Sequence, residues 1–293
     1  ISICSHLILS ASAVRNSTTR LALDKRTEAR SGSALQASLQ STDGKAGMGT
    51  KLIRIVILCT LCTFLLQCRM CTGVPRSDGR LHNIFFVLTD DQDVQLDGGE
   101  HQPSIKRLVA DRGLTLRNQF TSTPVCCPTR GAFLTGKHIH NIPMTNNSVQ
   151  GNCNGAAWRR GAEKQSMGVV MQSLGYRTMY AGKYLNTYGM DGAGGIEHVP
   201  PGWNNWVGLV GNSRYYNYSL SVNGKAETHK DDYAEDYLTD LVANRTNNFI
   251  RAAIEDDVPF FCVAAAPACH SPHQPAPQHA YSLTDKPFAK APR

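Results

Sequence analysis

The sequence predicts an α/β fold in which helices flank a central sheet. Two apolar, β-rich runs, residues 83–89 and 258–266, each stop abruptly at polar residues. Continuous apolar runs of this kind are typical of strands buried on both faces, as in a parallel sheet. Segments with helical spacing lie between them, and strands that alternate with helices form open α/β sheets. Ligands bind beyond the carboxyl ends of the strands in such sheets, so we expect a functional site there.

The elements of the first half follow in an order that fits this fold. The first strand is expected over 83–89, and residues 104–113 have helical spacing. A second helix, over 169–174, is expected to stop at Gly175, because glycine adopts the left-handed C-cap conformation without strain. The next strand is expected over 177–181.

The second half begins with a segment, 185–213, that is rich in Gly, Asn and Trp and is predicted to be a loop. Residues 215–222, followed by Asn223-Gly224, predict a hairpin. An amphipathic helix is expected over 232–254, since its apolar residues recur at helical spacing. These are Tyr233, Tyr237, Leu238, Leu241, Val242, Phe249 and Ile250.

Composition excludes several classes of protein. The 293 residues are 41% hydrophobic and 18% charged, which excludes wholesale disorder. No apolar run reaches the roughly 20 residues that span a bilayer, so we expect no stable membrane span. Residues 1–72 hold nine Lys/Arg and three Asp/Glu, which is nearly the whole net charge of +7. The rest is almost neutral, so we expect no nucleic-acid partner.

The front of the chain has the layout of a secretory signal peptide. A short basic stretch after Met48 precedes a 12-residue apolar run, 55–66. We predict a signal peptide over 48–72 and interpret residues 1–47 as upstream translation that is not native to the protein. Secretion agrees with three sequons, each a glycosylation acceptor where exposed, at Asn146, Asn217 and Asn244.

Two neighbouring carboxylates, Asp90 and Asp91, directly follow the first predicted strand. They repel each other unless a positive group lies beside them, and a hard divalent cation with oxygen ligands is the natural partner. An acidic loop exposed to solvent is the alternative interpretation of the pair.

The most specific pattern is Cys-x-Pro-Thr-Arg-x-x-x-Leu-Thr-Gly over residues 126–136. Its tail, 131–138, nearly fits a phosphate-binding loop. His138 replaces the Ser or Thr that would hold magnesium, however, and no strand precedes the segment. Taken alone, Cys126 and Cys127 predict a disulfide or buried thiols, which are usual in secreted proteins.

This pattern resembles the sulfatase signature C-x-P-S-R-x-x-x-L-T-G, with Thr129 in place of the usual Ser. Residues 175–185 resemble the second signature of the sulfatase family. The motifs D-D-Q-D, C-C-P, G-K-Y-L-N and Y-N-Y-S narrow the resemblance to the glucosamine-6-sulfatase branch. That branch contains the lysosomal N-acetylglucosamine-6-sulfatases and the extracellular heparan 6-O-endosulfatases. The resemblance covers roughly residues 82–293.

The resemblance implies an alkaline-phosphatase-like sulfatase fold with a mixed, mostly parallel sheet flanked by helices. Residues 82–293 would form the N-terminal portion of the catalytic domain, with its C-terminal part missing from this chain. The implied function is removal of 6-O-sulfate from N-acetylglucosamine units of heparan sulfate or keratan sulfate, with a sulfated glycosaminoglycan as substrate. The implied location is the secretory pathway, in the lysosome. An extracellular heparan sulfate 6-O-endosulfatase is the alternative.

The resemblance also assigns the nucleophile and the metal. Cys126 would be oxidised to formylglycine by the formylglycine-generating enzyme, and the hydrated aldehyde would both attack sulfur and later release sulfate. Asp90, Asp91 and the modified Cys126 would bind calcium, which polarises sulfate oxygens.

Three further residues receive roles from the resemblance. Arg130 lies four residues after Cys126, so the two share a face if the segment is helical, and Arg130 would steady the diol. Lys183 would pair with the sulfate as a point charge. His270 would protonate the leaving oxygen. Zinc is the rival for His270, because Cys262, Cys269 and His273 are near in sequence, but this spacing fits no usual zinc site.

Some family features are absent from the sequence. Leu185 stands where many sulfatases have His, a difference that the glucosamine-6-sulfatase branch shares. Nothing after His270 supplies the family's second pair of metal ligands, Asp-Asn, or its further Lys. We therefore expect this fragment alone to be inactive, and a non-catalytic sulfatase fragment is the third hypothesis. Beyond residue 72, the four cysteines other than Cys126 allow three disulfide connectivities, one of which joins Cys127 to Cys153 and Cys262 to Cys269.

Overall fold

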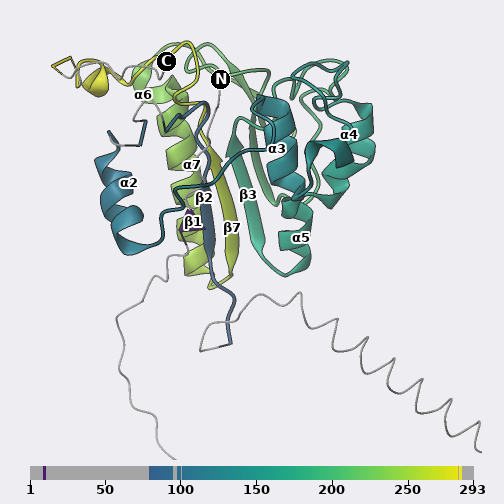
Figure 1. The fold of residues 1–293 in the computed structure, drawn as a ribbon, viewed down its shortest axis with the longest axis horizontal. Coiled ribbons are helices and arrows are strands. Elements are labelled where there is room, and N and C mark those ends of the chain that lie inside the picture. The colour runs from purple at the N-terminus through teal and green to yellow at the C-terminus, as the bar shows by residue number, and fades with distance from the viewer. Residues whose placement is uncertain (1–8, 11–78, 95–97, 100, 283, 286–293) are drawn as a thin grey trace, which may run out of the picture. The chain divides into compact units, whose positions relative to one another are not determined.

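A sheet of seven strands organises the chain (Figure 1), whose computed structural model describes residues 9–10, 79–94, 98–99, 101–282 and 284–285. The strand order is β1-β2-β7-β3-β4-β5-β6. The strands are β1 (Leu9–Ser10), β2 (Ile84–Val87), β3 (Arg177–Gly182), β4 (Asn205–Leu209), β5 (Ser219–Val222), β6 (Lys225–Thr228) and β7 (Phe260–Ala265). The predicted signal peptide over 48–72 lies outside the described residues.

The sheet is mixed, as predicted. Strands β2, β7, β3 and β4 pair in parallel, whereas β1, β5 and β6 join by antiparallel pairing. In the parallel part, Val87 pairs with Ala264, and Gly182 pairs with both Ala265 and Gly208. The four parallel strands therefore end at the same edge of the sheet, and the segments that follow them meet there.

Helices cover both faces of this sheet. Figure 1 shows α7 on one side of the strands and α3 and α5 on the other. Within the described residues, no helix has both the length and the apolar character needed to cross a membrane. The α-helices are α2 (Pro103–Leu108), α3 (Cys126–Thr135), α4 (Ala156–Arg160), α5 (Met167–Ser173), α6 (Tyr233–Asp236) and α7 (Leu238–Glu255). The short 3-10 turns are η2 (Ala110–Arg112), η3 (Ile139–Asn141), η4 (Ala162–Gln165) and η5 (Pro277–His279).

Burial on both faces explains why the sequence of strand β7 is apolar without alternation. Phe260, Cys262 and Ala264 belong to the core cluster that includes the inner face of α7. Phe261, between them, stacks on Trp203 on the other face, with ring centroids 5.7 Å apart. Because successive side chains of a strand point to opposite faces, a strand covered on both sides must be apolar throughout. The predicted strand over 258–266 is thereby confirmed.

The predicted turns are also confirmed. Asn223 and Gly224, between β5 and β6, have φ of 49° and 85°. Two consecutive residues with positive φ form the type I′ hairpin turn that an Asn-Gly pair favours. Gly175 has a φ of 87° and follows the end of α5, where the sequence predicts a helix stop.

Strand β4 was not predicted, because it lies inside the segment 185–213 that the sequence assigns to a loop. Trp206 of β4 is completely buried, and the strand pairs with β3 over Asn205–Gly208. Its Asn and Gly residues lack β propensity, and strand pairing overrides that local preference.

The predicted helix over 232–254 is divided in two. Asp232 caps α6 by accepting hydrogen bonds from the backbone N–H groups of Ala234 and Glu235. Tyr237 then leaves the helical region with φ −65° and ψ 108°, and α7 starts at the next residue. Tyr237 is buried, stacks on Tyr215 and donates a hydrogen bond to the carbonyl of Gln274. These tertiary contacts lie outside the helical period, so the apolar spacing alone does not reveal the break.

Candidate active site

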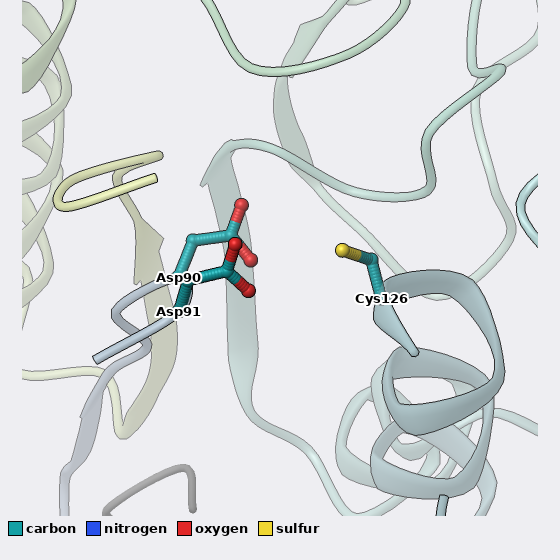
Figure 2. Close-up of side chains that lie close together, drawn as sticks. All are labelled: Asp90, Asp91 and Cys126. Atoms are coloured by element: carbon teal, nitrogen blue, oxygen red, sulfur yellow. The ribbon is translucent and has the colours of Figure 1, made fainter. Parts of the chain in front are cut away.

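Polar side chains converge where the four parallel strands end. Asp90 follows β2, Lys183 follows β3, Ser213 follows β4 and His270 follows β7. Cys126 is the first residue of α3 and faces the same edge (Figure 2). The structure therefore brings the predicted site residues together from segments up to 180 positions apart, as expected for an open α/β sheet.

Asp90, Asp91 and Cys126 form one compact group. Their potential ligand atoms all lie within 4.8 Å of one another. Figure 2 shows the Cys126 thiol at the start of α3, pointing across a gap toward the two carboxylates. Asp90 is only 5% exposed and its backbone N–H donates to the carbonyl of Ala268 at 3.0 Å. Asp91 is exposed and has a left-handed φ of 55°, which turns the second carboxylate beside the first.

Two buried cations flank Asp90. Lys183 Nζ lies 2.5 Å from Asp90 Oδ2, and Arg130 Nη2 lies 3.5 Å from Asp90 Oδ1. Burial alone would raise the pKa of the Asp90 carboxyl, but Arg130 and Lys183 outweigh it and hold this pKa below its ordinary value. Loss of one partner would leave an uncompensated buried charge, which is strongly destabilising. The ionised carboxylate and its two cations therefore form a single electrostatic unit.

Helix α3 gives Arg130 its position. Cys126 and Arg130 lie one turn apart on this helix, so the predicted shared face is confirmed. Arg130 is 4% exposed, and its guanidinium donates to the backbone carbonyl of Lys183. Tyr180 also donates to that carbonyl, at 2.7 Å, and burial raises the pKa of Tyr180 to about 12. The Tyr180 hydroxyl is therefore neutral and serves as a fixed donor near neutral pH.

The backbone at the end of β3 fixes Lys183. Gly182 has a φ of 106°, and a Cβ at this position would lie 2.1 Å from the carbonyl oxygen of Ala265. The N–H of Lys183 donates to the same oxygen at 2.8 Å. Only glycine combines this φ with so close an approach to β7. The turn directs the ammonium group of Lys183 into the site instead of into solvent.

His270 lies beside the acidic group. Its Nε2 is 3.6 Å from Asp91 Oδ2, and its Nδ1 is 2.6 Å from the carbonyl oxygen of Ser271. A carbonyl only accepts hydrogen bonds, so Nδ1 carries a proton and Nε2 is the atom that faces the site. Tyr215 donates to the backbone carbonyl of His270 at 2.8 Å, which anchors the segment after β7.

Ser213 belongs to the site although the sequence did not indicate it. Its hydroxyl accepts a hydrogen bond from Lys183 Nζ at 3.0 Å and donates one to Asp90 Oδ2 at 3.0 Å. Serine is common in loops, and Ser213 follows the unpredicted strand β4. If β4 had been predicted as a strand, Ser213 would have been expected at the functional edge of the sheet.

The disulfide predictions are half confirmed. Cys127 is bonded to Cys153, which ties the start of α3 to a distant loop and leaves Cys126 as a free thiol. The predicted bond between Cys262 and Cys269 is wrong, because both thiols are free. Cys262 is buried in the middle of β7, where burial raises the pKa of its thiol, whereas Cys269 is exposed after the strand.

The residue types of the acidic group determine which metal it can hold. Carboxylate oxygens suit a hard cation such as calcium, which takes six to eight oxygen ligands. The thiol of Cys126 is soft and does not suit calcium, whereas an oxygen-bearing product of its oxidation would. Asp90 and Asp91 thus fit part of a calcium shell. Among the described residues, no other cluster of three His, Cys, Asp or Glu side chains forms such a group, so the zinc alternative at His270 gains no support.

The three sequons are accessible. Asn146, Asn217 and Asn244 are all exposed, and Asn244 lies on the outer face of α7. Exposure is the condition for a glycan at each position, and their modification stays a prediction.

Comparison with known proteins places this site in a family. A family model described as Sulfatase matches residues 82–290. The chain is 42% identical to the N-acetylglucosamine-6-sulfatase of Homo sapiens over 224 residues, which cover 75% of this chain and 40% of that protein. It is also 42% identical to the extracellular sulfatase SULF-1 homolog of Drosophila melanogaster over 205 residues, 69% of this chain and 18% of that protein.

A solved structure is similar as well. It is a protein in complex with its substrate D-glucosamine-2-N,6-O-disulfate, with a TM-score of 0.55 and 26% identity over 70% of this chain and 38% of that one. The chain thus spans about 40% of the length of the human relative. The matching family model covers most of the residues in the sheet and every residue of the site. The chain belongs to the sulfatase family.

Proposed function

We propose that the protein hydrolyses the 6-O-sulfate ester of N-acetylglucosamine units in heparan sulfate or keratan sulfate. The observation that carries the proposal is the convergence of Cys126 with two aspartates and the buried cations Arg130 and Lys183. A sulfate monoester is anionic and resists nucleophiles. Its hydrolysis requires neutralisation of the sulfate, a strong nucleophile and a proton for the leaving oxygen. The similarity to N-acetylglucosamine-6-sulfatases favours this sugar.

The nucleophile in this proposal derives from Cys126. The formylglycine-generating enzyme would oxidise it, and formylglycine supplies a hydrated aldehyde with one hydroxyl for attack and a second for release of sulfate. The free state of the Cys126 thiol supports this role, because the neighbouring Cys127 is held in the disulfide with Cys153. Arg130, one turn along α3, would hold the residue at position 126 by charge and hydrogen bonding.

The aspartates would hold calcium, with Asp90 and Asp91 as ligands. When bound, calcium would neutralise part of the negative charge on the sulfate oxygens. Lys183 would bind a sulfate oxygen as a point charge, and Ser213 would keep the ammonium directed at it. His270 would hold a proton at Nε2 and give it to the leaving oxygen. That assignment is supported by the hydrogen bond at Nδ1, which leaves Nε2 as the atom on the site's side.

An extracellular heparan sulfate 6-O-endosulfatase is the second candidate. The equal identity of 42% to the N-acetylglucosamine-6-sulfatase of Homo sapiens and to the extracellular sulfatase SULF-1 homolog of Drosophila melanogaster supports it. The two functions differ in where they cut: the first acts at chain ends and belongs in the lysosome, while the second acts inside chains and outside the cell.

The test combines mass spectrometry and activity on the secreted full-length protein. The peptide that spans residues 121–130 is expected to show conversion of the Cys126 thiol to an aldehyde. Cys126→Ser is expected to abolish release of sulfate, whereas Cys262→Ala, which removes the buried free thiol in the middle of β7, is expected to retain it. A wild-type protein with unmodified Cys126 and no sulfate release would overturn the proposal. Size analysis of heparan sulfate fragments separates action at chain ends from internal action.

A further inference from the structure

We propose that Asn212 binds the sugar that carries the sulfate ester and that Asn186 positions it. This inference rests on the proposed function and deepens it, since it names residues that select the sugar and not the sulfate. Asn186 lies in the segment after β3, and Asn212 follows β4 next to Ser213. Both therefore lie at the functional edge of the sheet.

Hydrogen bonds fix the orientation of the Asn212 amide. Its Oδ1 accepts from Asn186 Nδ2 at 3.0 Å, and the Ser213 hydroxyl oxygen lies 3.5 Å from the same Oδ1. With the oxygen turned toward the protein, the NH2 group is turned away from these partners. Asn212 is exposed, so two N–H donors of a held side chain are available to a ligand. A side chain that is ordered before binding loses less conformational entropy when the ligand arrives.

The position of Asn212 relative to the charged groups indicates what it meets. Asn212 is the chain neighbour of Ser213, whose hydroxyl accepts a hydrogen bond from Lys183 at 3.0 Å and lies 3.5 Å from Asn212 Oδ1. Lys183 is the group that would bind a sulfate oxygen. The Asn212 amide, which is separated from Lys183 by Ser213, would then lie beside the alcohol part of the ester. The chemistry that fits is an acceptor oxygen of a hexosamine, either a ring hydroxyl or the carbonyl of an N-acyl group.

Asn186 provides an independent observation. It is 6% exposed, and its Oδ1 is buried without a hydrogen-bond partner among the described residues. Native proteins leave few buried polar atoms unpaired, and those that remain require a reason. Its backbone N–H points at Cys127 Sγ at 3.3 Å, which anchors it beside the disulfide next to Cys126. A packing role alone would be met by an apolar residue, whereas an amide is needed to orient Asn212.

The experiment compares two substrates on the secreted full-length protein. N-acetylglucosamine 6-sulfate carries the sugar, and 4-methylumbelliferyl sulfate presents the same sulfate on an aromatic ring without sugar hydroxyls. Asn212→Ala is expected to lower kcat/KM about threefold to tenfold for the sugar sulfate, the usual effect of one neutral hydrogen bond, and to leave the aryl sulfate unchanged. Asn186→Ala is expected to show the same selectivity. Asn247→Ala, on the exposed side of α7, is the matched control and should change neither substrate.

Equal loss on both substrates in Asn212→Ala would overturn the inference, because it would mean that Asn212 acts on Lys183 and Ser213 instead of the sugar. No change on either substrate would overturn it too. Wild-type protein that hydrolyses the aryl sulfate but not the sugar sulfate would instead refute the proposed substrate, and the selectivity inference would fall with it. Thermal melting of each variant shows whether it is folded, and a folded Asn186→Ala keeps the test decisive if Asn212→Ala fails to fold.

Discussion

Ser213 connects the two opposite charges at the centre of the site. It accepts from Lys183 and donates to Asp90, so Ser213→Ala leaves both groups with one hydrogen bond fewer. Because these bonds are to charged groups, we expect a loss of about 2 kcal/mol in transition-state stabilisation, or about thirtyfold in kcat/KM. The loss should be equal for sugar and aryl sulfates, since the sulfate end of the ester is affected.

Steady-state kinetics with both substrates check the effect of Ser213→Ala. Ser221→Ala is the control, because Ser221 is completely buried and donates to the carbonyl of Ile196 away from the site. It should lower stability and leave kcat/KM unchanged. A Ser213→Ala enzyme with wild-type kinetics would show that Lys183 needs no help from the hydroxyl.

A comparison of Gly182 with Gly211 distinguishes two reasons why a position requires glycine: positive φ and lack of space for a Cβ. Both have positive φ, but a Cβ at Gly182 would lie 2.1 Å from the Ala265 carbonyl oxygen, whereas nothing lies within 4 Å of one at Gly211. We expect Gly182→Ala to cost about 3 kcal/mol of unfolding free energy through backbone strain and overpacking together, and Gly211→Ala about 1 kcal/mol through strain alone. Denaturant unfolding measures both. Equal losses would contradict the steric contribution at Gly182.

At the scale of secondary structure, the sequence predicts elements that obey a single period or a single turn rule. Strand β7 and the Asn223-Gly224 turn are of this kind, because double burial and positive φ restrict the residue types at each position. Strand β4 could not be predicted, since its pairing with β3 decides its conformation against the propensity of Asn205 and Gly208. The break at Tyr237 was equally hidden, as it depends on contacts with distant rings.

The site shows the same division. Asp90, Cys126 and Lys183 were predicted through sequence patterns, and the structure places them at one edge. Ser213 and Asn212 carry no pattern of their own, because serine and asparagine in a loop are ordinary. Their significance comes only from the side chains that the fold places beside them.

Strand β6 and α7 are linked by an ion pair whose effect depends on pH. Glu227 contacts Arg245 at 2.6 Å and His229 at 2.8 Å. Burial alone would raise the pKa of Glu227, but the hydrogen bonds from His229 and Arg245 outweigh it and lower this pKa. A lowered folded-state pKa contributes stability above the unfolded value of about 4.3, and this stability is lost as the pH falls through the folded-state value.

The prediction concerns Glu227→Gln. The variant should be less stable than wild type at pH 7 by about 0.5 kcal/mol, a small value because these side chains are partly exposed and screened by solvent. The difference should shrink as the pH falls through the lowered folded-state pKa and disappear once wild-type Glu227 is protonated. Melting temperatures of both proteins, measured in steps from pH 7 into the acid range, provide the measurement. A difference that does not shrink toward low pH would indicate a packing effect instead of charge.

Across the whole molecule, a metal held by Asp90, Asp91 and the modified Cys126 would join the end of β2 to the start of α3. If calcium binds Asp90 and Asp91 in the folded state alone, it stabilises folding by about 2.7 kcal/mol at one hundred times its dissociation constant. We expect calcium to raise the melting temperature of the secreted full-length protein and a chelator to lower it. Asp91→Asn should weaken this response. The control is Asp256→Asn, which removes an exposed ion pair with Arg177 and should leave the response intact.

The burial of Arg130 limits when the proposed oxidation of Cys126 could take place. In the folded protein, Pro128 and Arg130, two of the defining residues of the signature, are buried within α3. An enzyme that recognises this signature by its side chains cannot reach them once the helix has docked on the sheet. If Cys126 is oxidised as proposed, that oxidation would have to compete in time with folding. Slower folding would then leave more time for modification, whereas faster folding would yield more molecules that are correctly folded but unmodified.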